Sequence, residues 1–468
     1  MRKIAFLLAF LAGCAAGPDY VRPQIEAPAQ YKELQGWRQA EPRDALPRGS
    51  WWTMFGDREL DALMARVELS NQTLRAAEAR FRQSRALADQ ARAALFPALS
   101  ANASATRSKS PSLSNQPSFA LGAVNNYNVA LNPSWELDVW GRVRRSVEAG
   151  EADWQASAAD LEAARLSAHA ALAQNYFALR VADATRQVLE DTVAAYERTL
   201  ELTRNRYAAG VAASVDVVQA EVQWKSAQAQ LIDVGVERAQ LEHAIALLVG
   251  EAPAAFSIER APFAAGMPTI PVGLPSELLE RRPDIAAAER SAAAANARIG
   301  VAQAAFFPTV TLSGAAGFRS TSAADLLTTP SRFWSLGGAL AQAVFDAGLR
   351  EAQKAQAIAV YDEDAATYRQ TVLTAFQEVE DNLAALRILE EEARLQDEVV
   401  LAARHALELT TNQYTAGIVS YLNVISAQTT LLSNERTAAS LLGRRLNASV
   451  ALVKASGGGW SAESLPRR

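Results

Sequence analysis

Arg206-Tyr-Ala-Ala-Gly210-Val-Ala-Ala-Ser214-Val-Asp216 in the first half of the chain matches Gln413-Tyr-Thr-Ala-Gly417-Ile-Val-Ser420-Tyr-Leu-Asn423 in the second half. The offset is constant at 207 residues, from Tyr207 to Tyr414. A glycine suits the left-handed residue that closes a helix, and Ser214 or Ser420 suits the N-cap of the next helix. Both stretches are therefore predicted to be the tips of long helical hairpins.

Long helical runs flank both turns. Proline is absent from 134 to 252 and from 331 to 465. Apolar residues recur at alternating spacings of four and three, which is the pattern of a heptad seam. We expect helices over 142–208, 215–249 and 346–416, and the first would be about 100 Å long. The seam residues are Leu189, Val193, Tyr196, Leu200, Thr203 and Tyr207 in the first half, where Thr203 is the one polar member, and Val372, Phe376, Val379, Leu383, Leu386, Leu395, Val399, Ala402, Ala406 and Leu409 in the second.

Shorter helices and strands precede each long helix. Helical patterns run from 57 to about 95 and from 275 to 307, and each ends at a Phe-Pro pair. The stretches 98–140 and 309–345 then change to a period of two, with Val129, Leu131 and Trp135 on one face of the second strand. This pattern fits a membrane barrel strand and equally a soluble sheet packed on one side. The aromatic residues near the strand ends fit a membrane-interface girdle or ordinary core packing: Trp135, Trp140, Phe306, Phe307, Trp334 and Phe345.

The strand count constrains the assembly. Each half supplies two strands, and four strands cannot close a barrel in lipid, where no open edge is tolerated. Three chains would supply twelve, which suggests a homotrimer. The expected fold is mixed: long helical hairpins form a tunnel, four strands per chain join a trimeric 12-stranded membrane barrel, and the chain contains an internal two-fold repeat. The predicted ranges are 57–250 for the first repeat, 251–274 for a linker, 275–455 for the second repeat and 456–468 for a tail.

The N-terminus carries a targeting signal. Arg2 and Lys3 precede a short apolar run that is too brief to span a membrane. The run ends in Leu11-Ala12-Gly13-Cys14, which resembles a bacterial lipobox. Residues 1–13 are therefore predicted to be a lipoprotein signal peptide and Cys14 the lipidated residue. The alternative is an ordinary signal peptide with an incidental cysteine. Residues 14–56 are interpreted as an extended tether.

Composition argues against several other functions. The formal net charge of -5 and the absence of a basic stripe disfavour a nucleic-acid partner. The three histidines, His169, His243 and His405, have no partner at metal-ligand spacing. We find no nucleophile elbow, phosphate loop or dinucleotide fingerprint. We therefore expect a protein that is not an enzyme and holds no metal or cofactor.

Several motifs occur along the chain: the lipobox, Gly17 to Pro23, Trp52 to Asp57, the two Phe-Pro breaks, Leu278 to Asp284 and the two Tyr-x-x-Gly turns. Together they resemble the motifs of the TolC-like outer membrane efflux proteins, in the lipoprotein branch that serves RND-type pumps. The resemblance covers nearly the whole chain. It implies an exit duct in the outer membrane of a Gram-negative bacterium, lipid-anchored and extended into the periplasm by helices. A periplasmic adaptor and an inner-membrane RND pump would open its periplasmic tip.

The resemblance implies roles at the two turns. The adaptor would dock on residues that also serve as plain helix ends: Ala209, Gly210, Val211, Ala416, Gly417 and Ile418. Asp216 and Tyr414 match a closed-tip network, although a carboxylate near a helix N-terminus is favourable without any gate. The second turn departs from the family pattern, because Asn423 and Ser426 stand where acids are common and Val419 where an Arg is. We therefore expect a gate held by hydrogen bonds and apolar contact, including Leu422, with weak block by cations.

Two other functions fit parts of the sequence. An outer membrane duct for type I protein secretion would share the same architecture. A lipid-anchored periplasmic coiled-coil scaffold would explain the hairpins and the anchor, but it leaves the four strands unexplained. The exported substrate is not determined by the sequence, since selection in such systems belongs largely to the pump.

Overall fold

The computed structural model describes residues 16–33, 50–109, 122–261, 267–268, 270 and 277–466. The predicted signal peptide and Cys14 lie outside these ranges, as does most of the predicted 251–274 linker beyond residue 261. The chain divides into two compact units. Unit 1 comprises Met1–Gln24, Arg80–Ser157 and Ala287–Arg369, and unit 2 comprises Ile25–Ala79, Ala158–Ala286 and Gln370–Arg468.

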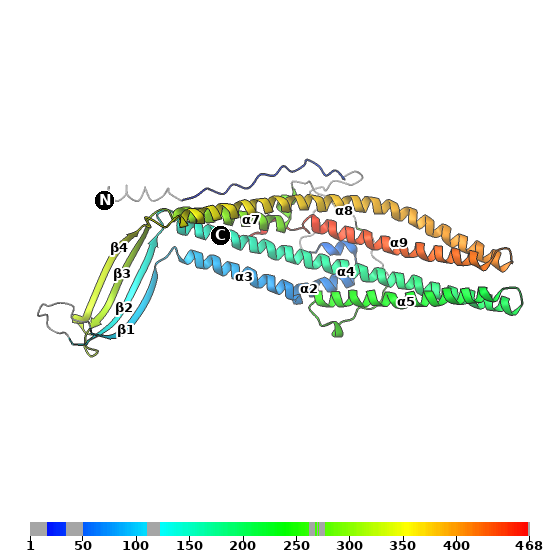
Figure 1. The fold of residues 1–468 in the computed structure, drawn as a ribbon, viewed down its shortest axis with the longest axis horizontal. Coiled ribbons are helices and arrows are strands. Elements are labelled where there is room, and N and C mark those ends of the chain that lie inside the picture. The colour runs from blue at the N-terminus through cyan, green and yellow to red at the C-terminus, as the bar shows by residue number, and fades with distance from the viewer. Residues whose placement is uncertain are drawn as a thin grey trace. The chain divides into compact units, whose positions relative to one another are not determined.

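Unit 1 contains one antiparallel sheet in the order β1-β2-β3-β4. Figure 1 shows the four strands side by side. Predicted strand regions were correct, but β4 ends before Phe345, because the ladder with β3 stops at the pair Thr309–Ala341. The strands are β1 (Ala98–Ser108), β2 (Val124–Leu137), β3 (Thr309–Ser320) and β4 (Arg332–Ala341).

The sheet has one apolar and one polar face. Register places Leu131 opposite Ala101 and Ala316, and alternation along each strand keeps the apolar residues together. The large apolar side chains of this face are exposed in the single chain: Leu99, Val129, Leu131, Trp135, Leu312, Trp334, Leu336 and Leu340. The opposite face carries small and polar residues, namely Ser100, Asn102, Asn128, Asn132, Thr311, Ser313 and Ser335.

Eight α-helices occur in the described residues, and the main ones form length-matched pairs. The long helices α4 (Arg142–Ala208) and α8 (Leu349–Thr415) each have 67 residues. α5 (Ser214–Leu248) and α9 (Tyr421–Ala455) each have 35, and α3 (Gln72–Ala93) and α7 (Pro283–Ala304) each have 22. The remaining helices are α2 (Arg58–Ser70) and α6 (Leu278–Arg281), with 3-10 turns at Trp51–Phe55, Pro253–Ala255, Thr329–Ser331 and Ala462–Ser464.

An aspartate lies shortly before each long helix, between the helix and the preceding strand. Asp138 accepts hydrogen bonds from the amides of Val143 and Arg144 at 2.8 and 2.9 Å. Asp346 likewise accepts from the amide of Gly348 at 3.1 Å and from the amide of Arg350, in the first turn of α8, at 3.4 Å. A carboxylate at this place satisfies amides that have no partner inside the helix and complements the positive end of the helix dipole. The predicted long helix over 142–208 is thus confirmed in full.

Two predicted helices are each broken into two. The pattern over 57–95 predicted one helix, but Asn71 interrupts it between α2 and α3. The side chain of Asn71 accepts from the amide of Leu74 at 3.0 Å and donates to the carbonyl of Leu248 at 2.7 Å. The predicted helix over 275–307 is broken at Arg282, because Pro283 begins α7 and disfavours a helical residue before it. The guanidinium of Arg282 donates to the carbonyl of Ala455 at 3.1 Å.

In unit 1 the segment 16–24 lies fixed along the helices rather than free. The amide of Ala16 donates to the carbonyl of Trp140 at 2.9 Å. Arg145 donates to Asp19 at 2.8 Å, and the Tyr20 hydroxyl donates to Glu289 at 2.7 Å. The backbones of Gly17 and Gly300 approach so closely that a Cβ on Gly17 would lie 2.3 Å from the Cα of Gly300. The predicted tether is extended here, and specific contacts hold it.

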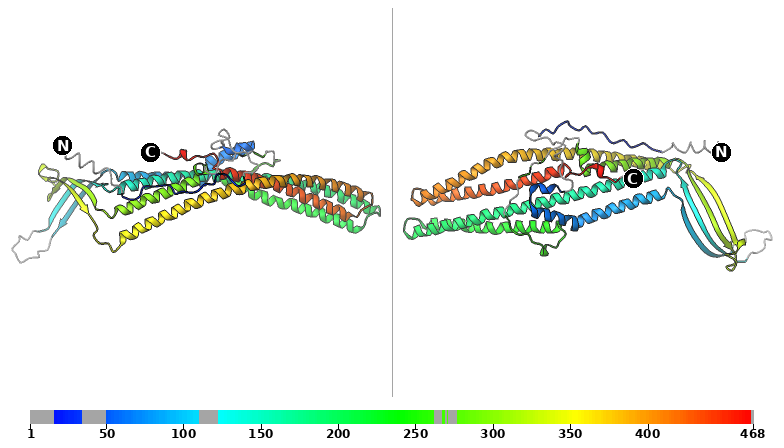
Figure 2. Two further views of the ribbon diagram at one scale, coloured as in Figure 1. Left: turned by 90° about the horizontal axis from the view of Figure 1, so that it is seen from above. Right: turned by 180° about the vertical axis from the view of Figure 1, so that it is seen from behind.

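In unit 2 the hairpins α4–α5 and α8–α9 run side by side in both figures (Figure 2). The seam residues Leu189, Leu200, Val372 and Leu383 are buried. Arg180 is 2% exposed and donates to Asp183 at 3.2 Å, while Arg238 donates to the same carboxylate at 2.7 Å. No described helix is both long enough and apolar enough to cross a membrane.

Candidate gate and docking tip

The two turns have the same backbone conformation. The amide of Val211 donates to the carbonyl of Arg206 at 2.9 Å, and Ile418 donates to Gln413 at 2.9 Å. Gly210 and Gly417 have φ values of 76° and 78°, in the left-handed region. This is the Schellman arrangement, in which a glycine after the helix lets two amides satisfy its last carbonyls. The predicted pair of hairpin tips is therefore present.

The six residues proposed to dock an adaptor are all exposed in the single chain. Val211 and Ile418 are the largest of them, with 65% and 73% of their surface accessible. Ala209, Gly210, Ala416 and Gly417 complete the set. Apolar residues that remain exposed beside a turn can enter a contact outside the chain without any rearrangement of the tip.

The helices that follow the two turns begin with different capping contacts. Ser214 was expected to cap α5, but it is the first helical residue, and Ala213 takes the cap position. The carboxylate of Asp216 compensates by accepting a hydrogen bond from the amide of Ala213 at 3.4 Å. In the second turn Ser420 is the cap, and its hydroxyl donates to the side-chain oxygen of Asn423 at 2.9 Å. A carboxylate thus supports the first helix start and a neutral pair supports the second.

Tyr414 lies in a small core at the tip of unit 2. It is 3% exposed and packs with Tyr421, Val424, Leu200 and Ala220. The rings of Tyr414 and Tyr421 are 5.4 Å apart and tilted by 54°. Burial, followed by the neighbouring Tyr414, raises the pKa of Tyr421 well above its usual range, so the phenol stays neutral. Apolar packing holds this part of the tip.

Arg206 was not singled out by the sequence. Its Nη1 donates to the carbonyl of Thr415 at 2.6 Å, and its guanidinium carbon lies 4.8 Å from the centre of the Tyr414 ring. The contact joins the end of α4 to the end of α8, across 209 residues of sequence. The second repeat has Gln413 at this position. This difference between two otherwise matching turns was the sequence signal that could have identified Arg206.

The predicted gate residues do not form one cluster within the chain. Asp216 contacts its own helix start, and the Tyr414 hydroxyl has no hydrogen-bond partner among the described residues. Leu422 is 58% exposed, and Asn423 and Ser426 are also exposed. Tyr414 is therefore placed to hold the two hairpins together, whereas Leu422, Asn423 and Ser426 are free to face another molecule.

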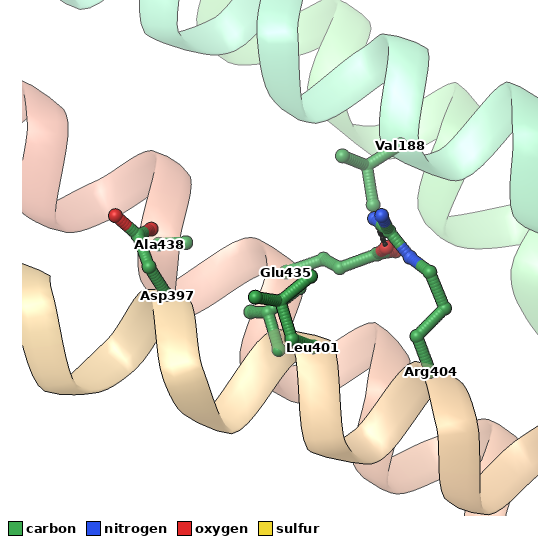
Figure 3. A pocket seen from close by; sticks show the side chains of 7 residues that line it. Val188, Asp397, Leu401, Arg404, Glu435 and Ala438 are labelled. Atoms are coloured by element: carbon green, nitrogen blue, oxygen red, sulfur yellow. Dashed lines mark hydrogen bonds and ion pairs between the residues drawn. The ribbon is translucent and has the colours of Figure 1, made fainter.

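A shallow hollow of about 370 Å³ lies further along the same hairpins in unit 2. Figure 3 shows Arg404 on α8 pointing toward Glu435 on α9, and the two form an ion pair at 2.6 Å. Val188, Leu401 and Ala438 supply apolar walls. Of the three charged residues at the hollow, Arg404 and Glu435 are paired with each other, and Asp397 is exposed.

The part of the chain that the structure describes contains no cluster of three or more His, Cys, Asp or Glu side chains able to hold a metal. His169 is buried and packs on Trp52 with ring centres 4.6 Å apart. Its Nε2 lies 3.0 Å from a carboxylate oxygen of Glu68, and this interaction lowers the pKa of Glu68. We interpret this group as a structural contact between α2 and α4.

Comparison with known proteins adds independent information. A family model described as "Outer membrane efflux protein" matches residues 63–251 and 274–458. The pyoverdine export outer membrane protein OpmQ of Pseudomonas aeruginosa is 33% identical, over 99% of this chain and 98% of its own. The toluene efflux pump outer membrane protein TtgC of Pseudomonas putida is 32% identical, over 98% and 95%. The solved outer-membrane channel OprN superposes with a TM-score of 0.90 at 31% identity, covering 96% of this chain and 100% of its own.

Proposed function

This chain belongs to the outer membrane efflux protein family and is an outer membrane exit duct, and we propose that three copies of it form the duct. Its relatives are channel proteins rather than enzymes. In this proposal the four strands of each chain close into a 12-stranded barrel, and the helical hairpins line a tunnel on the periplasmic side. Cargo passes through passively, and the gate at the tip controls its passage.

The sheet of unit 1 is the observation that carries the proposal. Its apolar face has no covering layer in the described chain, and Trp334 and Leu336 are 80% and 81% exposed. Its other face is polar, as expected of a lumen. β1 and β4 are unpaired on their outer sides within the described residues. A trimeric barrel in a membrane accounts for all of these surfaces. Lipid covers the apolar face, water contacts the polar face, and a neighbouring chain pairs with each edge strand.

Exposed apolar stripes in unit 2 support assembly of the helical part. On α5 the stripe recurs at helical spacing and contains Val215, Val218, Val222, Ile232 and Val236, each at least 55% exposed. On α8 the predicted seam residues Leu395, Val399 and Leu409 remain 44–49% exposed, although the seam nearer the middle of that helix is buried. Heptad stripes that find no partner in one chain fit the corresponding stripes of a second copy.

We also propose that Cys14 carries the lipid anchor. Ala16 follows it by two residues and is fixed to the carbonyl of Trp140, just beyond the end of β2. Two residues of chain reach at most about 7 Å. An acyl chain attached at that position would start beside the end of the strands, where the membrane surface is expected. Acyl chains contribute about 0.8 kcal/mol per buried CH₂, and more than one is needed for firm anchoring.

The partners are also part of the proposal, which the exposed tips and the family support. A periplasmic adaptor would dock on the exposed tip residues around Gly210 and Gly417, and an inner-membrane RND pump would supply the cargo. The gate would involve Tyr414 within each chain and Asp216, Leu422, Asn423 and Ser426 where three tips meet. Packing and neutral hydrogen bonds, rather than a complete ring of acids, would hold it closed.

A paired substitution on β4 tests the barrel. Leu336 lies on the apolar face, and its neighbour Ser335 lies on the polar face. Leu336→Arg would place a charge in lipid, at a cost of up to about 2–4 kcal/mol per chain, whereas Ser335→Arg would place it in the lumen. We expect Leu336→Arg to abolish the heat-modifiable gel shift of the trimer and its conductance in liposomes.

Ser335→Arg is the matched control. It should preserve the gel shift and change only the ion selectivity of the conductance, because lumen charges tune which ions pass. Equal tolerance of both variants would contradict a membrane barrel and favour a periplasmic scaffold. Loss of folding in both would contradict the assignment of the polar face to an aqueous lumen.

A further inference from the structure

The end of the sheet opposite the helix connections is basic. Helices join the strands at one end only, and at the other end β1 stops at Ser108 and β4 starts at Arg332. The stretches 107–135 and 309–345 contain a single acid, Asp325. The same stretches contain four cations, all at or near this end: Arg107, Lys109, Arg319 and Arg332. In the proposed barrel this is the outward end, because the helices extend into the periplasm.

Two of these arginines lie on the apolar face of the sheet. Side chains alternate along a strand, so Arg107 shares its face of β1 with Leu99, and Arg332 shares its face of β4 with Trp334. Both arginines are exposed, and the guanidinium carbon of Arg332 lies 5.9 Å from the centre of the Phe318 ring. Each cation therefore stands on the surface that the proposed barrel turns to lipid.

The third arginine lies on the other face. Arg319 is opposite Asn128 in the ladder between β2 and β3, on the polar side. Its guanidinium carbon lies 4.8 Å from the centre of the ring of Phe333, which belongs to the same face. Like Arg107, it is the second-last residue of its strand. Arg319 thus places an equal charge at the same end of the sheet, but toward the proposed lumen.

The apolar face of β4 changes in character toward the outward end. Leu340 and Leu336 come first, then Trp334 and finally Arg332, and the three apolar side chains are 70–81% exposed. An aliphatic stretch that ends in an aromatic residue is typical of a strand that passes from hydrocarbon to the head groups. A long cationic side chain at that level keeps its stem in the apolar layer and its charge among the head groups. Arg332 is therefore placed at the head groups of the outer leaflet.

The two lipid-facing arginines stand on opposite edges of the sheet. β1 and β4 are its outer strands, and each pairs with a single neighbour within the described chain. Closure of the proposed trimer pairs β1 of one chain with β4 of the next, which brings Arg107 and Arg332 of different chains to the same boundary. Like charges disfavour such an approach unless an anion lies between them. The guanidinium fork matches the oxygens of a phosphate in geometry and in charge.

We propose that Arg107 of one chain and Arg332 of the next bind a phosphate group of the outer-leaflet lipid at each chain boundary. In a Gram-negative outer membrane this lipid is lipopolysaccharide, whose lipid A part carries phosphates in its head group. The site is incomplete without a second copy of the chain, so bound lipid joins neighbouring chains and stabilises the trimer. This inference rests on the proposed barrel, because a single chain does not bring its two edges together.

Lipid retention by full-length trimers tests the site. Purified, delipidated trimers in detergent would be incubated with diphosphorylated lipid A. Native mass spectrometry would count the bound lipid, and gels would follow thermal dissociation of the trimer. We expect lipid A to bind to the parent and to raise its dissociation temperature. Arg107→Gln and Arg332→Gln should each weaken binding by about tenfold, because each removes a charge-assisted contact with phosphate.

Arg319→Gln is the matched control. It removes the same charge from the same end of the sheet, but on the polar face, and should leave lipid retention unchanged. A double variant with Arg107→Lys and Arg332→Lys keeps both charges without the fork, so it should bind more tightly than the double Gln variant and less tightly than the parent. Undiminished binding in the double Gln variant, or an equal loss in Arg319→Gln, would overturn the proposal.

Three further ligands identify the source of the phosphate. Dephosphorylated lipid A, phosphatidylglycerol and inorganic phosphate would be compared with diphosphorylated lipid A at the same concentration. We expect all three to bind the parent more weakly and to stabilise the trimer less. Equal stabilisation by inorganic phosphate would indicate a free-anion site and contradict a lipid ligand. Equal retention of phosphatidylglycerol would contradict recognition of lipid A, and equal retention of the dephosphorylated form would contradict a role for phosphate.

The gel shift and the conductance of the same samples separate this site from the barrel itself. A parent that shows the heat-modifiable shift and conducts in liposomes, but retains no lipid A, contradicts the lipid site alone. A parent without either property contradicts the barrel and the site together. The double Gln variant should keep both properties, since Arg107 and Arg332 are exposed. If it does not assemble, the Lys variant and the comparison of ligands on the parent decide the proposal.

Discussion

The two turns share one backbone and differ in nearly everything that their side chains contact. Gly210 and Gly417 adopt the same left-handed conformation, and the hydrogen bonds around them match. Yet Tyr414 is 3% exposed, and Tyr207, at the corresponding position, is 52% exposed. A glycine and two helix ends are enough to specify the turn. Which tyrosine is buried depends on the neighbouring hairpin.

The same asymmetry recurs along the long helices. Arg180 is buried and pairs with Asp183, whereas the corresponding Arg387 is about half exposed and pairs with Glu33 at 2.7 Å. His169 packs on Trp52, and the corresponding residue of the second repeat is Phe376. Duplication preserved the length and course of the helices, while the polar contacts of the two copies diverged. Differences in polar contacts between the two copies therefore indicate the positions at which each copy has a separate role.

The largest expected contrast is between the two tyrosines. Tyr414→Ala removes a buried ring and should cost about 3–5 kcal/mol at the tip, whereas Tyr207→Ala should change stability by no more than about 0.5 kcal/mol. Hydrogen exchange of the backbone amides in the last turns of α4 and α8 would measure both. An equal loss in the two variants would show that Tyr207 is buried by something outside its own chain.

The glycines should behave alike and so serve as the internal reference. Gly210→Ala and Gly417→Ala each place a Cβ on a residue with positive φ, at a cost of about 1–2 kcal/mol. A Cβ at Gly210 meets nothing within 4 Å, and at Gly417 only Arg206 Nη2 at 4.0 Å. Thermal unfolding monitored at the tips should show matching losses. A loss confined to one variant would contradict the equivalence of the two turns.

The smallest expected effect on stability is at the second helix start. Asn423→Asp restores a carboxylate in the first turn of α9 and should stabilise it by about 0.3–1 kcal/mol. In a trimer it would also create a ring of three acids, which should bind cations. Conductance with a trivalent cation should therefore show weak block in the parent and strong block in the variant. Strong block in the parent that Ser426→Ala abolishes would contradict a neutral second turn.

Much of the fold follows from sequence periodicity. The heptad spacing and the absence of proline predicted both 67-residue helices to within three residues, because these signals are summed over many positions. The breaks at Asn71 and Arg282 were missed. The first depends on the Asn71 side chain, which reaches the distant carbonyl of Leu248, and the second on Pro283, which disfavours a helical residue before it. At the tip, the six residues proposed for docking are exposed, but the contact of Arg206 with Thr415 depends on the register between two hairpins. The periodicity of one helix carries no information about that register.

Corresponding helices of the two repeats have equal lengths. The pairs α4 and α8, α5 and α9, and α3 and α7 agree in length to the residue. One inserted residue would advance the following part of a helix by about 1.5 Å and turn it by about 100°. That change would carry one tip out of line with the other and rotate its seam away from its partner. Insertions and deletions in this lineage are therefore expected only as compensated pairs, or in the loops that join the strands.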